Sequence, residues 1–386
     1  MNPIIQLKRT APVFVAALLL ACFGFLPETR AVVPAPDGGY PGFNTAEGED
    51  ALFSLANGSY NTAVGYFALK TNFAGFFNTA LGAGTLFANT ADENTATGAG
   101  ALLSNTTGFE NTAHGAFALI SNTEGIANTA IGDSALYSNT MGVANTAIGF
   151  WALKLNINGN QNTASGERAL YKNTTGTKNT ATGFESLFNN TTGGSNTVLG
   201  VDAGNGITTA SNVTCIGANV AGANVSDTTW IGNVYGVTTQ NGTTAPVVIS
   251  ADGQLGTVAS SQQFKKDIAA MEKASEAILS LRPVTFHYKA DSKGEPQFGL
   301  IAEEVAKVNP ALVLSDKEGK PYTVRYDAVN TMLLNEFLKE HQKVEALEAM
   351  VADLVTTVKK QTAQIEKISA RVEINEAAPQ TVLNSN

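Results

Sequence analysis

The chain has 386 residues, of which 44% are hydrophobic and 15% are charged, and its formal net charge at pH 7 is -9. This composition excludes a disordered chain, because it supplies enough apolar surface for a core, and the length allows two or three domains. The negative charge, without a basic patch that carries interleaved aromatic residues, argues against a nucleic-acid partner.

The first 31 residues have the pattern of a signal peptide. Lys8 and Arg9 precede an apolar run over residues 13–26, and small residues follow near a predicted cleavage point after Ala31. We therefore expect a protein that is secreted or displayed at the cell surface.

The two cysteines determine whether the chain can form a disulfide and whether a lipid anchor is an alternative to release. Cys22 lies inside the predicted signal peptide, where a lipoprotein signal is the alternative interpretation. After removal of residues 1–31 only Cys215 remains, so an internal disulfide is excluded. In the mature chain no apolar run reaches the ~18 to 20 residues that a membrane-spanning helix needs.

A repeat of 17 residues dominates the chain from about residue 44 to 235. A threonine stands three positions before its marker glycine, an alanine usually follows that threonine, and an asparagine usually precedes it. A fixed period of this length predicts a stack of near-identical layers. The marker glycines recur at steps of 17, with a single step of 16, at Gly48, Gly65, Gly82, Gly98, Gly115, Gly132, Gly149, Gly166, Gly183, Gly200 and Gly217.

Each layer reads roughly as N-T-A-x-G-x-x-A-L-x-x-N-T-T-G-x-x. Asn and Gly accept the left-handed backbone of tight corners, whereas the T-A-x-G run suits a short strand. The sequence therefore predicts a mainly β protein whose residues 32–237 form a β-solenoid or β-roll. Its coils stack about 4.8 Å apart, and ladders of asparagine satisfy one another's amides. A helix is disfavoured because Gly, Asn and Thr are weak helix formers.

The inward positions of each layer are small apart from one leucine. Because so narrow a coil encloses little apolar volume, we expect these leucines and the phenylalanines to pack against neighbouring chains in a homotrimer. The phenylalanines in question are Phe67, Phe76, Phe77 and Phe117. The repeat resembles the β-roll heads of trimeric autotransporter adhesins, whose short N-x-A-x-G repeats wind three chains about one axis. This resemblance implies an adhesin-like fibre, for which a cell-surface or carbohydrate ligand is an open possibility.

The composition changes after the repeat. Residues 238–259 are predicted as a neck with one strand-like run at 245–250. Residues 260–330 are predicted as a small α+β domain. Its expected elements are a helix that opens at Ser260 and ends before Pro283, strands at 284–289 and 297–302, a short helix at 303–308, and a hairpin of 312–314 with 322–326.

From Asp327 the chain reads as one long helix with a heptad seam, which predicts a coiled coil over residues 331–375 and a disordered tail at 376–386. The β-branched residues of the first seam position permit two strands or three, and only the repeat favours three. The first seam position holds Val344, Val351, Val358, Ile365 and Val372, and the second holds Leu347, Leu354, Gln361 and Ile368.

Four blocks in order resemble the intramolecular chaperone and auto-processing domain at the C-terminus of phage tail spikes, endosialidases and some secreted bacterial fibres. This resemblance implies a domain that trimerises, guides the folding of the β-structure ahead of it and, in many members, cuts itself off. The blocks are residues 264–268, 281–288, 299–305 and 333–339.

The same resemblance implies a catalytic serine at the start of the released fragment and an assisting lysine five residues later. Those positions hold Ser260 and Lys265. Ser260 Oγ would attack the carbonyl of Ala259, with neutral Lys265 as general base and Lys266 as a nearby cation that lowers the lysine pKa.

A structural interpretation of these residues stands beside the catalytic one. Ser260 and Gln263 fit the S-x-x-Q capping box that starts many helices. The two lysines would then lie on a solvated face. The residues after the serine, from Ser261 to Gln263, also depart from the acidic residue and arginines that are usual in that family.

Other chemistry is sparse, and we expect neither a metal nor a cofactor. His114, His287 and His341 lie far apart in unrelated contexts. Glu303 and Glu304 are adjacent on a predicted helix, so they point to different sides and do not form an acid pair.

Three classes of function are considered for this sequence. The first is a secreted trimeric fibre with its own C-terminal chaperone, and a phage-type tail fibre or a purely structural fibre without self-cleavage is its close variant. A carbohydrate-acting enzyme is disfavoured because the repeats leave no room for a catalytic domain. A binder of ice or crystal surfaces rests on the threonine ladder alone.

Overall fold

The computed structural model describes residues 40–240, 242–289 and 291–376, and the chain divides into two compact units, one ending at Gly242 and the other beginning at Thr243. The predicted signal peptide, with Cys22, lies outside the described residues, and so does the predicted tail beyond Glu376.

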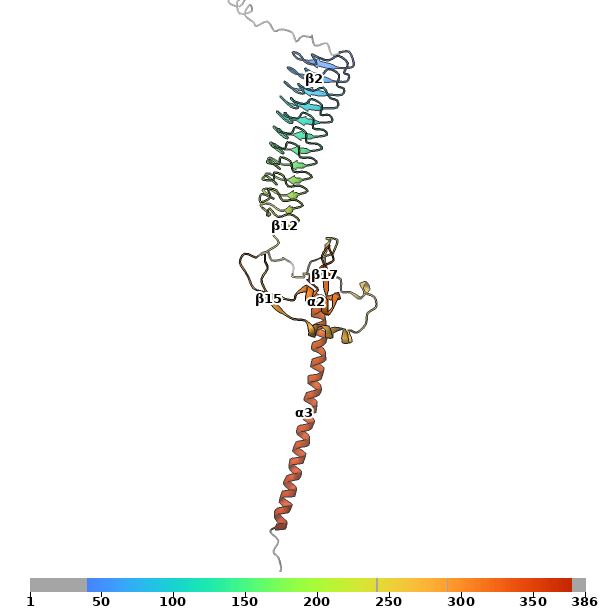
Figure 1. Ribbon diagram of the computed structural model, residues 1–386, viewed down its shortest axis with the longest axis vertical. Coiled ribbons are helices and arrows are strands. Elements are labelled where there is room, and N and C mark those ends of the chain that lie inside the picture. Colours follow the sequence, from blue (N-terminus) through green and yellow to red (C-terminus); the bar gives the residue numbers. More distant parts are fainter. Residues whose placement is uncertain (1–39, 241, 290, 377–386) are drawn as a thin grey trace, which may run out of the picture. The chain divides into compact units, whose positions relative to one another are not determined.

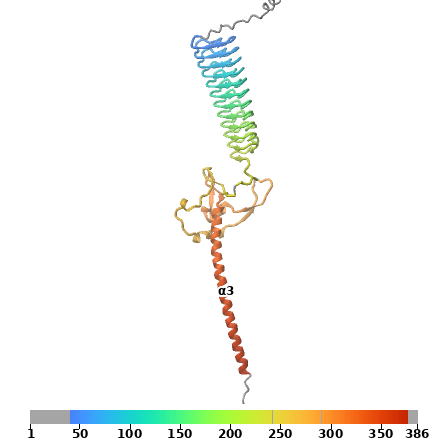
Figure 2. The same cartoon turned by 180° about the vertical axis from the view of Figure 1, so that it is seen from behind.

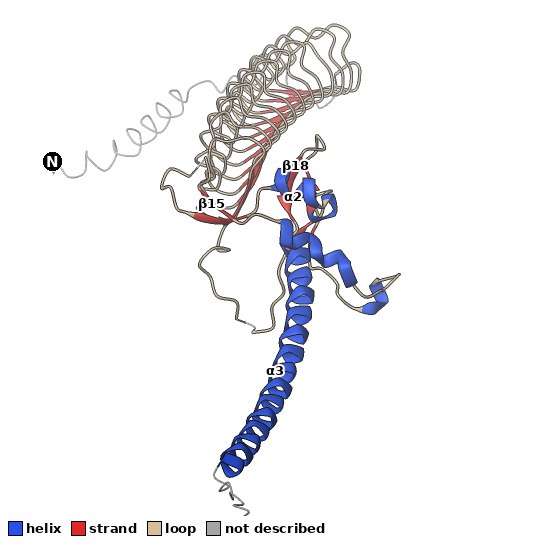
Figure 3. Cartoon of the chain, turned by 60° about the horizontal axis from the view of Figure 1, so that its bottom comes forward, coloured by secondary structure: helices blue, strands red, loops and turns tan. Residues whose placement is uncertain are grey.

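The first unit is a β-solenoid built on one parallel sheet of 12 short strands. Figures 1 and 2 show its coils stacked in a single column, and Figure 3 shows its strands in one line along the column. The predicted β-solenoid of 17-residue coils is thereby confirmed. Its strands are β1 (Thr45–Glu47), β2 (Thr62–Val64), β3 (Thr79–Leu81), β4 (Thr95–Thr97), β5 (Thr112–His114), β6 (Thr129–Ile131), β7 (Thr146–Ile148), β8 (Thr163–Ser165), β9 (Thr180–Thr182), β10 (Thr197–Leu199), β11 (Thr214–Ile216) and β12 (Thr229–Ile231).

Like residues lie over like residues from one coil to the next. Thr129 pairs with Thr146 and Ala130 with Ala147 in the register of β6 and β7. Because side chains alternate along a strand, the middle residue points into the coil while the threonine and the third residue point outward. The alanine column is almost completely buried along β2 to β9.

The leucine of each coil is also inside its own chain, which corrects the expectation that it packs against neighbouring chains. Leu69, Leu136 and Leu170 have no exposed surface at all within a single chain. The outcome for the phenylalanines is different, since Phe77 and Phe117 remain about half exposed. A stack of coils encloses more volume than a single coil suggests, because each leucine is covered by the leucines above and below it.

Two ladders of buried asparagine run through the solenoid. In one, Asn128 donates from Nδ2 to Asn111 Oδ1 at 3.1 Å and to the carbonyl of Gly142 at 2.7 Å. In the other, Asn122 donates to Asn105 Oδ1 at 2.7 Å. Each amide therefore satisfies a corner carbonyl and the neighbouring coil together, as buried polar groups require.

Both ladders end at the same coil. Ile207 and Val213 occupy the two asparagine positions there, and both are fully buried. The amide of Val213 still satisfies Asn196 Oδ1 at 2.9 Å, but Asn190 Oδ1 has no partner in the described part of the chain. The polar stack is thus closed by apolar side chains near its C-terminal end.

The repeat glycines are required by close approach as well as by backbone conformation. Gly132 has φ +132°, and a Cβ there would lie 2.6 Å from the carbonyl oxygen of Gly149. The leucine corner has a left-handed backbone wherever the leucine is present, as at Leu136 with φ 52°. A buried leucine holds this strained conformation because the stacked coils leave the chain no alternative path.

The second unit has three small antiparallel strand pairs, short 3₁₀ segments and two α-helices. The predicted strands, hairpin and short helix of residues 284–326 are present. The strands expected at 284–289 and 297–302 end three residues earlier, and the helix begins one residue earlier, at Ala302. The elements are β13 (Val248–Ile249), β14 (Leu255–Gly256), η1 (Gln262–Phe264), η2 (Glu272–Ser280), β15 (Val284–Phe286), β16 (Gln297–Gly299), α2 (Ala302–Val308), η3 (Pro310–Leu312), β17 (Val313–Ser315), β18 (Pro321–Val324) and α3 (Tyr326–Glu376).

The helix predicted from Ser260 to just before Pro283 was wrong. The segment forms the separate 3₁₀ segments η1 and η2, because Lys265 is extended at φ -121° and ψ 144° and Asp267 is left-handed at φ 55°. Neither conformation continues a helix.

The core of the second unit is small. Its buried apolar residues are Val305, Leu312, Val324 and Met332, and several large side chains remain exposed around them, among them Phe298 at 80% and Phe264 at 69%. A large exposed apolar surface on a folded domain marks an interaction site.

Candidate functional site

The two residues that the sequence singled out lie next to each other. Lys265 Nζ lies 3.3 Å from Ser260 Oγ and donates a hydrogen bond to it. The 3₁₀ turn η1 brings the two side chains together by reversing the chain between them, and both residues are exposed. A serine hydroxyl beside an amine is the geometry that a Ser-Lys pair needs before proton transfer.

The helix-capping interpretation of Ser260 finds no support here. The turn η1 has Ser261, not Ser260, as its N-cap, and the side chain of Ser261 caps no backbone amide. Lys265 follows as the C-cap through its backbone amide, which donates to the carbonyl of Gln262 at 3.0 Å. The hydroxyl of Ser260 is therefore engaged by the lysine and not by the start of a helix.

Both residues line one groove of about 1040 Å³, here called the Ser260 groove. Ala259 lines it as well, so the peptide bond on the N-terminal side of Ser260 is open to the same space. The groove is bounded by the neck strand β13, by the residues that lead into η2 and by the first turns of α3.

Arg325 is the cation of this groove that the sequence did not indicate. It lines the groove together with Asp327, whereas Lys266 does not. Arg325 also donates from Nη1 to the carbonyl of Ala311 at 3.2 Å, which ties the segment before α3 to η3. Only the fold brings this residue near Ser260, since 65 positions along the chain separate them.

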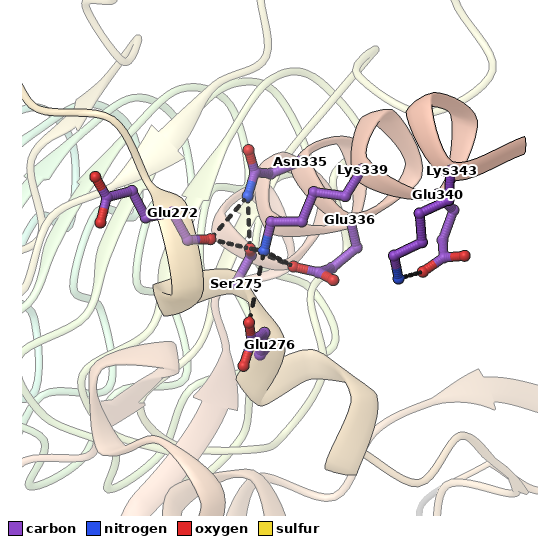
Figure 4. Close-up of polar contacts among 8 residues, drawn as sticks. All are labelled: Glu272, Ser275, Glu276, Asn335, Glu336, Lys339, Glu340 and Lys343. Atoms are coloured by element: carbon purple, nitrogen blue, oxygen red, sulfur yellow. Dashed lines mark hydrogen bonds and ion pairs between the residues drawn. The ribbon is translucent and has the colours of Figure 1, made fainter. Parts of the chain in front are cut away.

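Behind the groove, η2 and α3 are joined by a polar cluster, here called the Ser275 network. Figure 4 shows its side chains converging from the two elements. Ser275 has no exposed surface and donates to Glu336 Oε1 at 2.5 Å. Glu336 is 8% exposed and also accepts from Lys339 Nζ at 2.7 Å. The members of the network are Ser275, Asn335, Glu336 and Lys339.

Among the described residues of this unit, three carboxyl groups have a pKa below their ordinary values: Asp291, Glu304 and Glu336. Backbone hydrogen bonds from Lys293 and Glu295 lower the pKa of Asp291. The hydrogen bond from Lys339, and then that from Ser275, lowers the pKa of Glu336 below its ordinary value of 4.5. The guanidinium of Arg282 donates to Glu304 through Nη2 at 2.5 Å and through Nε at 3.2 Å, and it lowers the pKa of that carboxyl. Glu304 is thus an ion-pair partner that joins α2 to the segment before β15.

The long helix α3 leaves its heptad seam without a partner. Val351 and Val358 are 57% and 54% exposed, and Leu347 and Ile368 are exposed to a similar extent. Near its start, a second, apolar groove of about 670 Å³ is lined by residues that include Ile278, Leu281, Phe298 and Leu333. The single chain therefore leaves two apolar surfaces of this unit open.

The histidines do not come together. His114 lies on β5 in the solenoid, His287 follows β15, and His341 lies on α3 beside Glu345 at 3.4 Å. Across residues 40–376, apart from 241 and 290, no group of His, Cys, Asp and Glu is placed to hold a metal ion. In the same described residues, none of the helices has both the length and the apolar character for crossing a bilayer.

Residues 260–314 match a protein-family model described as chaperone of endosialidase. The match begins at Ser260 and confirms the resemblance drawn from the first three sequence blocks, while the block at 333–339 lies beyond it. It points to a tail-fibre-like trimeric protein with a chaperone towards its C-terminus. Searches of curated proteins and of solved structures found no match to this chain.

Proposed function

We propose that the chain is a secreted homotrimeric fibre whose second unit acts as an intramolecular trimerisation chaperone and then releases itself by cleavage before Ser260. The observation that carries this proposal is the open seam of α3. Val344, Val351 and Val372 are each about half exposed on a helix of 51 residues. A lone helix with such a seam is stabilised by packing against other copies.

The small core of the second unit supports the same assembly. Exposed aromatic side chains such as Phe298 and Tyr322, at 80% and 75%, gain cover only from another surface. Three copies joined by α3 supply that surface to one another. They also align three solenoids in parallel, which reduces the entropic cost of starting the β-stack.

The cleavage step uses the Ser260 groove. Ser260 Oγ attacks the carbonyl carbon of Ala259 while the neutral amine of Lys265 takes the hydroxyl proton. The bond from that carbon to the Ser260 nitrogen breaks, the nitrogen takes the proton from Lys265, and an ester on Oγ remains. Water then hydrolyses the ester, which leaves a carboxylate on Ala259 and restores the hydroxyl of Ser260.

Secretion is part of the proposal and rests on the sequence of residues 1–31 alone. A tail fibre of a phage is the alternative, and the match to a chaperone of endosialidase favours it. Growth of an expressing culture, followed by N-terminal sequencing of protein from the medium or periplasm, separates the two. Cleavage after Ala31 supports export, and an intact residue 1 supports the phage alternative.

The central test compares the full chain with Ser260→Ala and Lys265→Ala variants. We expect a fragment of residues 260–386 from the full chain and none from either variant, with a trimeric mass by sedimentation in all three. Ser261→Ala and Lys266→Arg are matched controls, because the first changes the neighbouring serine and the second keeps the positive charge at position 266, and both should cleave normally. A monomeric mass would reject the trimer, and an uncut trimer would reject only the cleavage.

A further inference from the structure

The Ser275 network is the most completely buried polar cluster that the described part of the second unit contains. Its hydrogen bonds join residues 60 to 64 positions apart in the chain. Ser275 donates to Glu336 and accepts from Asn335 Nδ2 at 2.6 Å and from Lys339 Nζ at 3.3 Å. The hydroxyl also lies 3.2 Å from the carbonyl oxygen of Glu272 in its own element, so its contacts are shared between η2 and α3.

The network fastens two walls of the Ser260 groove to each other. Ala274, directly before Ser275, and Met271 line the groove from the side of η2. Thr331 and Met332 line it from α3, one turn before Asn335 and Glu336. The groove therefore lies on one side of this contact, with its two walls held by the hydrogen bonds behind them.

The charges of the network reinforce its hydrogen bonds. Glu336 and Lys339 form an ion pair at 2.7 Å, and Lys339 also lies 3.9 Å from Glu276. Glu336 is nearly buried, whereas the Lys339 side chain is 32% exposed, so removing Lys339 or Ser275 takes away part of what compensates the carboxylate. The members of the network therefore support one another.

We propose that Ser275, Asn335, Glu336 and Lys339 are positioning residues for self-cleavage, which hold the groove walls so that Lys265 stays beside Ser260. This inference rests on the proposed function. The four residues touch no reacting atom. They act through Met271 and Met332, whose placement decides how closely the Lys265 segment approaches the scissile bond.

The test uses the full chain and compares Glu336→Gln and Ser275→Ala with Glu340→Gln. The control is matched, since Glu340 pairs with Lys343 at 2.5 Å on the same helix but is exposed (Figure 4). We expect Glu336→Gln and Ser275→Ala to slow fragment release by about tenfold or more, and Glu340→Gln to stay within about twofold. Ser275→Ala keeps the Glu336–Lys339 pair, so it reports on the network if Glu336→Gln does not fold.

A second readout measures the reactivity of the side chain at position 260, and it is made on the intact chain because a cysteine there is itself a nucleophile toward the Ala259 carbonyl. In a chain with Cys22→Ala, Cys215→Ala and Ser260→Cys, the rate of alkylation by iodoacetamide is followed against pH. A lysine ammonium beside a thiol lowers the thiol pKa, so opening the network should shift this profile to higher pH and slow alkylation at pH 7 by about threefold or more. Glu340→Gln should leave the profile unchanged.

The outcomes separate the two proposals. If the unmodified chain is not cut, self-cleavage is rejected. The effect of the network on residue 260 is then assessed from the pH profile of alkylation alone. If Glu336→Gln and Ser275→Ala leave both the cleavage rate and the profile as they were, the positioning role is overturned even though cleavage stands.

Discussion

Lys265 Nζ lies 3.3 Å from Ser260 Oγ, with the scissile bond after Ala259 open to the same groove. A lysine can serve as a general base only when it loses its proton, whereas arginine keeps its proton in proteins. The conservative change Lys265→Arg therefore keeps the positive charge but removes the base. We expect it to abolish release of residues 260–386 on a denaturing gel, while Lys266→Arg leaves release unchanged. Normal cleavage by Lys265→Arg would exclude general-base catalysis by this residue.

Leu136→Ala tests the finding that the leucines are internal to each chain. Leu136 is fully buried within its own coil, so its truncation should lower the free energy of unfolding by about 2–5 kcal/mol. Phe117→Ala is the comparison, because its ring is 45% exposed and should contribute much less. Urea denaturation followed by circular dichroism measures both. A larger loss of unfolding free energy from Phe117→Ala than from Leu136→Ala would indicate that the main apolar packing lies between chains and not within each coil.

Asn128→Ala tests the asparagine ladder. The substitution removes the donor to Gly142 O and the acceptor of the Asn145 amide at 3.0 Å, and both are buried. We expect a loss of about 1–3 kcal/mol for each group left without a partner. Asn158→Ala, at an exposed position of the same unit, should change the unfolding free energy by about 0.5 kcal/mol or less. Equal losses of unfolding free energy from Asn128→Ala and Asn158→Ala would show that the ladder stabilises the fold no more than an exposed asparagine does.

Charged residues in the seam of α3 should dissociate the trimer. The double change Val351→Asp and Val358→Asp puts carboxylates at two first seam positions, where three copies would bring them together. Sedimentation at micromolar concentration should show a monomer. Thr356→Asp adds a charge at a position outside the seam and should remain trimeric. A trimer that survives the double change would place the interface elsewhere.

Glu336 should make the second unit sensitive to acid. Its pKa in the folded chain is lowered by Lys339 and Ser275, so its stabilising contribution is present above the ordinary value of 4.5 and is lost as the pH falls through the lowered folded value. Thermal unfolding between pH 7 and pH 2 should therefore show a stability loss below about pH 4.5 that Glu336→Gln reduces. Glu340→Gln serves again as the control, and identical acid profiles for both variants would contradict this role of Glu336.

The solenoid could be predicted from the amino-acid sequence, because the residues that specify it are close together in the chain and recur in each repeat. Each T-A-x run and each marker glycine sets a strand and a corner, and the repeat then leaves only one register. The short strands, the helix at 303–308 and the long helix from Asp327 are predicted from local patterns of the same kind, and the structure has them at close bounds. The proximity of Ser260 and Lys265 could also be predicted, since the two residues are five positions apart on either side of one turn.

Features that depend on the enclosed volume or on contacts between distant residues could not be predicted from the sequence and are known from the fold. Whether Leu136 points inward or toward another chain follows from the space between stacked coils, which no single repeat reveals. Lys265 and Asp267 break the helix predicted after Ser260 without any proline or glycine to indicate it. Arg325 lines the Ser260 groove although it lies 65 positions after Ser260, and the Ser275 network joins residues 60 to 64 positions apart, so both are set by tertiary packing.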